Sequence, residues 1–268
     1  RVGPSWWNVA AAQEGDATQA PVVESRAAGP VELLIEGYDA PEGPAFDKAG
    51  NLYFVDSFVS SIVKVTPEGE GSEFFNTGGI PAGLAFHPDG NLWVADEGEN
   101  IHGILRISAD GTSSGIVVNE YEGAPLNGAN DLVFSADGIL YFSDPWDAPG
   151  GFYRYVPDGK LEQLDTNLRF PNGVALTAAG DAVILAEAGL NRLLRYAIAA
   201  DGTAGEREVW VTLDGAFAAD GMAYDERGDL YVAHYGGGHV DVVNPDGETV
   251  EQILVPGAEV TNVAFGGP

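Results

Sequence analysis

The chain has 268 residues, 45% of them hydrophobic, which suffices for a sizeable buried core in one large or two average domains. Its 41 acidic and 12 basic residues give a formal net charge of −29, which argues against nucleic acid or an anionic membrane as a partner and predicts a solvated acidic surface. Cysteine is absent, so the fold relies on no disulfide bond. No apolar run reaches the roughly 18 residues of a membrane-spanning helix.

Residues 1–30 do not resemble the rest of the chain. They carry a small aromatic cluster at Trp6 and Trp7, followed by sequence rich in Ala, Pro and polar residues. A basic start and an apolar centre are both lacking, so we do not predict a signal peptide. We expect a leader that is weakly structured or packed on the body, and the sequence leaves the cellular location undetermined.

A regular pattern begins at residue 31. An alternating segment, VELLIEG, precedes residues 42–56, EGPAFDKAGNLYFVD, and two more short apolar segments follow before residue 78. Gly, Asp and Asn mark the turns between these segments. The pattern predicts four short strands in an antiparallel meander.

The phrase at residues 42–56 recurs along the chain. It returns as AGLAFHPDGNLWVAD from Ala82, NDLVFSADGILYFSD from Asn130, NGVALTAAGDAVILAE from Asn172 and DGMAYDERGDLYVA from Asp220, with a last start, TNVAFGGP, at Thr261. A period of about 40–50 residues with four strands per unit is typical of a β-propeller, whereas β-solenoid units are shorter. Six starts predict an all-β, six-bladed propeller over residues 31–268.

The sixth repeat contains only one predicted strand, at residues 261–268. Residues 31–37 match the fourth-strand sequence EQILVPG of residues 251–257, so we expect this N-terminal strand to close the sixth blade. Convincing second and third strands for that blade are not found, and the sixth blade is expected to be incomplete.

Equivalent positions at the starts of the six first strands should form a ring around the central channel. The ring reads Glu42, Ala82, Asn130, Asn172, Asp220, Thr261. Carboxylate and amide oxygens suit a hard cation such as Ca²⁺, and the absence of His and Cys from the ring makes a zinc site less natural. Turn chemistry explains any one of these residues well, but four oxygen donors in one register favour a site.

The phrases EGPAFDKAGNLYFVD, NGANDLVFSADGILYFSDP, FPNGVAL and DGMAYDERGDLYVA closely resemble the SMP-30/gluconolactonase/luciferin-regenerating-enzyme family, which includes lactonases and diisopropylfluorophosphatase-like enzymes. The resemblance covers about residues 31–268. It implies a six-bladed propeller with a divalent metal, usually Ca²⁺, although Zn²⁺, Mn²⁺, Mg²⁺ or Fe²⁺ also fit. By motif, the implied metal ligands are the four oxygen donors of the ring: Glu42, Asn130, Asn172 and Asp220.

The resemblance implies a hydrolase, and a lactonase that opens a small lactone is the first hypothesis. The cation polarises the ester carbonyl, Glu42 and Asp220 are the predicted catalytic residues, and either Asp220 or a metal-bound hydroxide acts as the base. Asn127 is predicted to contact substrate, and Asp131 to orient the site from behind the ligands. Weaker candidates for substrate contact are Trp146, Tyr235 and His234; His234 and its neighbour His239 are also open to a turn role or a second cation site.

Two alternatives remain open at this point. The same cation site would serve a phosphotriesterase by polarising a P=O bond, or the chain is a non-catalytic, calcium-binding propeller. Serine-triad, phosphate-loop and dinucleotide motifs are absent, so those chemistries are set aside. The oligomeric state is not predicted.

Overall fold

The computed structural model describes residues 29–146, 149–215 and 218–266. Within these ranges the chain forms five four-stranded antiparallel sheets and one small hairpin. Every sheet is a meander in which each strand pairs with the next along the chain. This confirms the predicted all-β repeat of four strands. The predicted leader lies, apart from its last two residues, outside the described part of the chain.

The strands are short, as the spacing of the turns predicts. Blade 1 holds β1 (Pro41–Phe46), β2 (Leu52–Asp56), β3 (Ser61–Val65) and β4 (Gly71–Asn76). Blade 2 holds β5 (Pro81–Phe86), β6 (Leu92–Asp96), β7 (Gly103–Ile107) and β8 (Ser114–Val118), and the hairpin β9 (Glu120–Tyr121) and β10 (Ala124–Pro125) follows. Blade 3 holds β11 (Leu132–Phe134), β12 (Leu140–Asp144), β13 (Gly150–Tyr155) and β14 (Leu161–Leu168). Blade 4 holds β15 (Pro171–Leu176), β16 (Ala182–Glu187), β17 (Arg192–Ile198) and β18 (Ala204–Thr212). Blade 5 holds β19 (Ala218–Tyr224), β20 (Leu230–Tyr235), β21 (His239–Val243) and β22 (Thr249–Leu254).

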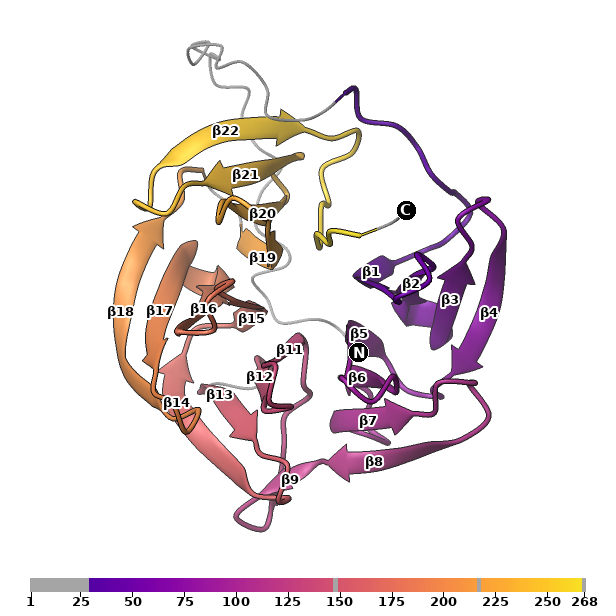
Figure 1. The fold of residues 1–268 in the computed structure, drawn as a ribbon, viewed down its shortest axis with the longest axis horizontal. Helices are drawn as coiled ribbons and strands as arrows, with labels where there is room; N and C mark the ends of the chain where they lie inside the picture. The colour runs from indigo at the N-terminus through magenta and orange to yellow at the C-terminus, as the bar shows by residue number, and fades with distance from the viewer. Residues whose placement is uncertain (1–28, 147–148, 216–217, 267–268) are drawn as a thin grey trace.

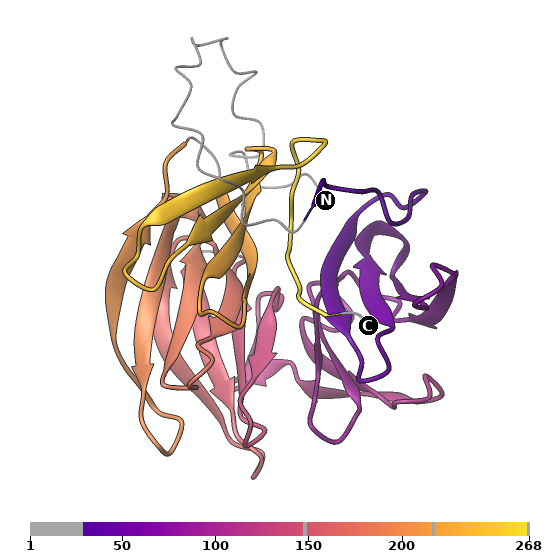
Figure 2. The same cartoon turned by 45° about the horizontal axis from the view of Figure 1, so that its top comes forward.

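The five sheets stand around a common centre, as Figure 1 shows. The first strand of each sheet lies innermost and the fourth lies at the rim. The ring has a gap between blade 5 and blade 1. Two irregular segments pass through that gap: the chain before β1 and the chain after β22 (Figures 1 and 2).

The prediction of a sixth four-stranded blade is not confirmed, because the described residues form five. Residues 31–37 are not a strand; Ile35 and Tyr38 instead pack against the apolar side chains of blade 1. Residues 260–266 are not a strand either, although Thr261 bonds to both neighbours: its carbonyl accepts from Gly221 N–H (2.8 Å) and its hydroxyl donates to the Pro41 carbonyl (3.2 Å).

The physical reason is a lack of pairing partners. A strand at either end of a sheet is held by hydrogen bonds to the strand beside it, and the described residues supply no second and third strands that would join these two segments. Between them lies a groove of about 430 Å³, lined mainly by residues 32–38 and reaching Glu42, Thr261 and Asn262.

A repeated turn explains why the first two strands of each blade pair in the same way. In blade 1, the Asp47 carboxylate accepts hydrogen bonds from the backbone of Ala49 and Asn51, both at 2.9 Å, and Gly50 has a φ of 83°. In blade 2 the equivalent turn has Gly90 at 90° and uses Asp89 to bond Asn91. Glycine is favoured there because side chains rarely adopt this left-handed backbone. These aspartates serve the scaffold, as predicted.

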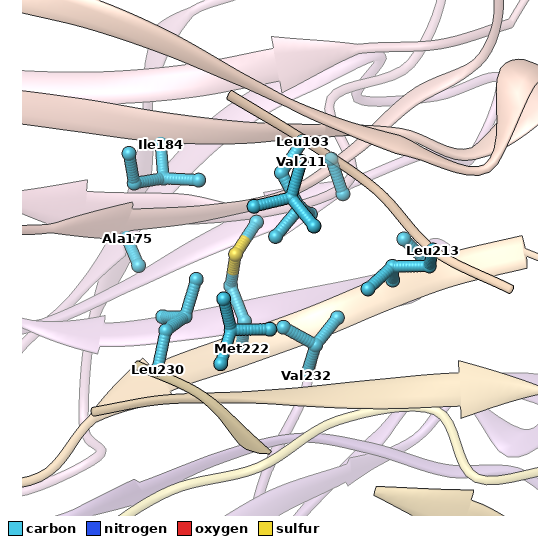
Figure 3. Close-up of a cluster of buried hydrophobic side chains, with 11 residues drawn as sticks. Ala175, Ile184, Leu193, Val211, Leu213, Met222, Leu230 and Val232 are labelled. Carbon is cyan, nitrogen blue, oxygen red and sulfur yellow. The ribbon is translucent and has the colours of Figure 1, made fainter. Parts of the chain in front are cut away.

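The core lies between neighbouring sheets. Alternate residues of each strand face the next blade, so apolar side chains of adjacent blades interdigitate. Figure 3 shows one such layer, in which Ile184 and Leu193 of blade 4 meet Met222, Leu230 and Val232 of blade 5. The described residues contain no helix with the length and apolar character needed to cross a bilayer.

Candidate functional site

Buried carboxylates at the end of the second strands hold the chain where it enters the first strands. Asp56 accepts from Ala40 N–H (3.1 Å), and Asp96 accepts from Ile80 N–H (2.9 Å). In blades 3 and 4, Asp144 accepts from Gly128 N–H (2.7 Å) and Glu187 from Arg169 N–H (2.8 Å). All four carboxylates are buried. These hydrogen bonds fix the backbone just before the ring positions in blades 1 to 4, which restricts where the ring residues can lie.

The innermost strands approach one another so closely that glycine is required beside the ring. A Cβ on Gly43 would lie 2.1 Å from the carbonyl oxygen of Ala82, and one on Gly173 would lie 2.2 Å from that of Asp220. Gly83 is similarly tight, at 2.7 Å from the carbonyl oxygen of Asn130. The Gly that follows a ring residue in the sequence therefore lets neighbouring blades meet, which brings the ring residues together.

The four predicted ligands converge as the register requires. Glu42 lies on β1, Asn172 on β15 and Asp220 on β19, while Asn130 comes two residues before β11. Asn172 donates a hydrogen bond to Asp220, and the charge of Asp220 acts on Glu42 across the channel. The other two ring positions hold Ala82 and Thr261.

Asp131 occupies the position that glycine takes in the other complete blades. Its Oδ2 accepts from Val174 N–H of the next blade at 2.7 Å, and its own backbone N–H donates to Ser143 Oγ at 3.1 Å. Burial raises the pKa of Asp131 to about 6, although hydrogen bonds from backbone N–H groups partly offset the rise. The side chain is thus fixed next to ring residue Asn130, and its role in orienting a metal site stays a prediction.

The pKa values of the two acidic ring residues, Glu42 and Asp220, are raised by the same causes. Burial raises the pKa of Glu42 well above its usual value, and the charges of Asp220 and Asp131 add to the rise. Burial likewise raises the pKa of Asp220, with Asp131 the next contribution. Neutral hydrogen-bond donors, Asn262 Nδ2 at 3.3 Å and the backbone of Gly43, partly offset this rise for Glu42.

Sequence reasoning missed Glu97 and Asn262. Asn130 Nδ2 donates to Glu97 Oε1 at 2.7 Å. The side-chain oxygen of Asn130, Oδ1, is then the atom that Asn130 can offer to a cation. Burial raises the pKa of Glu97 to about 7, against the lowering effect of its bond from Asn130. The sequence signal for Glu97 is its position directly after the second strand of blade 2. The signal for Asn262 is its position directly after ring residue Thr261.

The residues fit a divalent cation of the hard, oxygen-binding class. Three acidic side chains, Glu42, Asp131 and Asp220, act on one another in a desolvated centre, and no positively charged side chain is among the groups that shift their pKa values. Such an arrangement is unfavourable unless protons or a cation neutralise it. Glu42 and Asp220 supply carboxylate oxygens and Asn130 and Asn172 amide oxygens, the donors that Ca²⁺ prefers.

The weaker candidates have varied positions. Trp146 lies beside Gly128 and packs edge-on against Phe170, and its indole lowers the pKa of Glu97. Tyr235 interacts with Glu259 and, more weakly, with Asp220; burial, the largest cause, raises its pKa to about 12. Both are thus near channel carboxylates, and their substrate contacts stay predictions.

The structure places the other two candidates differently. Asn127 donates its backbone N–H to Asp144 at 3.0 Å, a structural bond that leaves its predicted substrate contact untested. His234 is buried, and its ring contacts Asp241 and His239 of the same blade. Its substrate contact also stays a prediction.

Comparisons with known proteins agree with this fold and show the family. The family model described as the SMP-30/gluconolactonase/LRE-like region matches residues 40–268. Diisopropyl-fluorophosphatase of Loligo vulgaris is 32% identical, with 87% of this chain and 84% of that protein aligned. Gluconolactonase of Zymomonas mobilis is 30% identical, over 88% of this chain and 76% of that protein. A solved structure of a putative gluconolactonase superposes with a TM-score of 0.81 at 25% identity, covering 90% of this chain and 87% of that one.

Proposed function

The chain belongs to the SMP-30/gluconolactonase/LRE-like family, and on this premise we propose that it is a divalent-metal-dependent hydrolase that opens a small lactone. The substrate class comes from the relatives, two kinds of which are named lactonases or gluconolactonases. The observation that carries the metal dependence is the group of oxygen donors from different blades, set around a centre with unbalanced negative charge.

Glu42, Asn130, Asn172 and Asp220 would hold the cation, and Ca²⁺ suits this donor set best. When bound, it would act as a Lewis acid on the carbonyl oxygen of the substrate. Glycines follow Glu42, Asn172 and Asp220, and the buried carboxylates Asp56, Asp144 and Glu187 anchor the chain before Glu42, Asn130 and Asn172; both features support a fixed arrangement of the donors. The site is therefore preorganised, which is the condition for electrostatic catalysis.

We assign the proton transfer to Asp220. A carboxylate whose pKa is raised by burial and by a neighbouring negative charge is a better base near neutral pH than an ordinary one. Coordination would lower that basicity, so we assign to Glu97, which has a pKa of about 7 and accepts a hydrogen bond from Asn130, the role of second proton acceptor; its charge contributes to the raised pKa of Asp220. Asp131 keeps the backbone of blades 3 and 4 together behind this pair.

The proposed substrate contacts surround this centre. Tyr235 lies close enough to Asp220 to feel its charge, and Trp146 lies beside Glu97. An aromatic wall of this kind would bury the apolar face of a lactone ring, while Asn127 would donate to its hydroxyl groups. Strongly anionic substrates are disfavoured by the net charge of −29.

A second function has specific support. The relative from Loligo vulgaris, at 32% identity, is named for the hydrolysis of a fluorophosphate. The same cation and carboxylates would polarise a P=O group and activate water. We therefore retain organophosphate hydrolysis as the alternative activity of this site.

The test is a panel of aldonolactones, dihydrocoumarin and an organophosphate, assayed with and without EDTA. We expect lactone opening that is lost on chelation and restored by Ca²⁺. Asp220→Asn and Glu42→Gln should each abolish turnover while circular dichroism shows an intact fold; Asp137→Asn, an exposed turn residue, is the matched control. Hydrolysis that persists in EDTA would refute the metal dependence, and activity in both variants would refute the site.

A further inference from the structure

The fifth blade departs from the repeat at His234. This residue lies opposite Ala219, one position before ring residue Asp220. In blades 1, 2 and 4 the same register position is filled by the buried carboxylates that anchor the first strand: Asp56, Asp96 and Glu187. An imidazole therefore replaces a carboxylate at a position where the other blades use the acid to accept backbone hydrogen bonds.

The next strand departs from the repeat as well. Asp241 on β21 pairs with Val232, and the equivalent residues of the other blades are apolar or aromatic: Val63, Leu105, Tyr153 and Leu194. All of these are buried, and Asp241 is also buried, with 2% of its surface exposed. A carboxylate at a core position is unfavourable unless it is paired or bound to a metal.

His239 completes the cluster. It lies directly across from His234 in the β20–β21 pair, joined by the turn at residues 236–238, and the two rings are 4.5 Å apart. His234 Nδ1 is 2.7 Å from Asp241 Oδ2, and His239 Nε2 is 3.4 Å from Asp241 Oδ1. One ligand atom from each of the three residues lies within 4.8 Å of the other two.

The hydrogen bonds around His239 determine which nitrogen offers a lone pair. Its Nδ1 is 2.9 Å from the carbonyl oxygen of Gly237, and a carbonyl only accepts, so Nδ1 carries the proton. In the neutral ring, Nε2 is then unprotonated and directed toward Asp241. This is the usual arrangement of a metal-binding histidine, in which the second nitrogen is fixed by a carbonyl or carboxylate.

Gln252 could supply a fourth metal ligand. Gln252 on β22 places its amide nitrogen 3.2 Å from His239 Nε2 and 2.9 Å from Asp241 Oδ1. The amide holds the two acceptors together when no ion is present. A rotation of the amide by half a turn would present Oε1 to the same centre, since the two ends of the group have nearly the same shape.

We infer that His234, His239 and Asp241, with Gln252 as the fourth donor, form a binding site for a transition-metal ion of the Zn²⁺ class. Tetrahedral ligands at the usual Zn–N and Zn–O distances lie about 3.3–3.5 Å apart, and His239 Nε2 and Asp241 Oδ1 are 3.4 Å apart. His234 Nδ1 is closer, 2.7 Å from Asp241 Oδ2; because a carboxylate only accepts, this nitrogen carries a proton when no ion is bound, and the ion would replace that proton. Two imidazoles and one carboxylate select a borderline metal over Ca²⁺.

This site is separate from the channel in chemistry and in position. The channel ligands are oxygen atoms on the innermost strands, whereas the histidine site lies on β20, β21 and β22. An ion bound here would join the strand next to that of Asp220 to the outer strands of blade 5. It would raise the free energy of unfolding by an amount that grows with the logarithm of the free-ion concentration over Kd.

The test is a titration of the full chain with Co²⁺ in excess Ca²⁺, followed by the visible absorption bands of tetrahedral Co²⁺ and then by displacement with Zn²⁺. We expect one equivalent of Co²⁺ to give these bands. His239→Gln and Asp241→Asn should each raise the Kd for Co²⁺ at least about 10-fold, since even the loss of a residue that only supports a metal ligand lowers metal affinity roughly 10- to 100-fold. Thermal unfolding and circular dichroism establish that both variants are folded.

Two controls distinguish this site from others. His87→Gln removes an imidazole whose Nδ1 is 2.8 Å from Asp89 and should leave the Co²⁺ bands unchanged. Glu42→Gln, which alters the channel, should also leave them unchanged. The inference is overturned if the wild type gives no tetrahedral bands, or if the bands survive in folded His239→Gln; in either case the cluster is a hydrogen-bonded network only.

Discussion

Asp131→Asn should stabilise the metal-free protein at neutral pH. The pKa of Asp131 is about 6 instead of 3.8, because burial penalises the ionised form. Each pKa unit corresponds to about 1.4 kcal/mol, so ionised Asp131 lowers the free energy of unfolding by about 3 kcal/mol. Asparagine keeps the shape and an oxygen that accepts from Val174 N–H, and it removes the charge.

The sign of the pH dependence follows from the direction of the shift. Below about pH 4, Asp131 is protonated in both the folded and unfolded states and the substitution should have little effect. As the pH rises from about 4 to about 6, the unfolded state ionises before the folded state does, so the wild type loses stability relative to Asp131→Asn, and the difference should reach its full value above about pH 7.

The assay is urea unfolding in EDTA at pH 4, 6 and 8, followed by tryptophan fluorescence. The exposed turn variant Asp137→Asn is the control and should change the free energy of unfolding by less than about 0.5 kcal/mol. Saturating Ca²⁺ should shrink the advantage of Asp131→Asn, because the cation stabilises the ionised centre. A variant no more stable than wild type at pH 8 in EDTA would refute the claim that this carboxyl is held at an electrostatic disadvantage.

Two further predictions concern the neighbours of the ring. The Ca²⁺ affinity of the wild type should rise between pH 6 and 8, and Glu97→Gln should reduce this rise, because the variant lacks the carboxyl group with a pKa of about 7. Calorimetric titration with Ca²⁺ at pH 6 and pH 8 measures the two affinities. An equal rise in the variant would show that other groups cause it. Gly173→Ala should destabilise the fold by about 2 kcal/mol, since its Cβ would lie 2.2 Å from the Asp220 carbonyl. Gly115→Ala, on an exposed strand with open space around it, is the matched control and should be near neutral in thermal unfolding.

The repeat made most of the scaffold predictable. The alternation in segments such as LYFVD and the turns with Gly50 and Gly90 are local signals, so four-stranded meanders follow from the sequence alone. The number of blades was not predictable in the same way. A short apolar segment such as residues 31–37 becomes a strand only if a neighbour pairs with it, and that is a property of the whole sheet.

The site was predictable to the extent that it follows the repeat. Glu42, Asn130, Asn172 and Asp220 share one register, and residues that share a register come close together when the blades stand around a common centre. Glu97 is not a ring residue; it reaches Asn130 from the loop after β6, at a separation of 33 residues. Its role depends on how blades 2 and 3 pack, and no spacing rule in one sequence encodes that contact.

Departures from the repeat carry the remaining information. The five blades share one fold, and four of them have an apolar or aromatic residue at the position that Asp241 occupies in blade 5. The fold of a blade therefore does not require aspartate at that position. By that reasoning Asp131, which stands where blades 1, 2, 4 and 5 have glycine, is a candidate for a role in the proposed channel site. Asp241 and His234 depart in the same sense, and they do so together and in contact. The pairing of His234 with Asp241 satisfies the buried carboxylate, and together with His239 it is the observation on which the proposed second metal site rests.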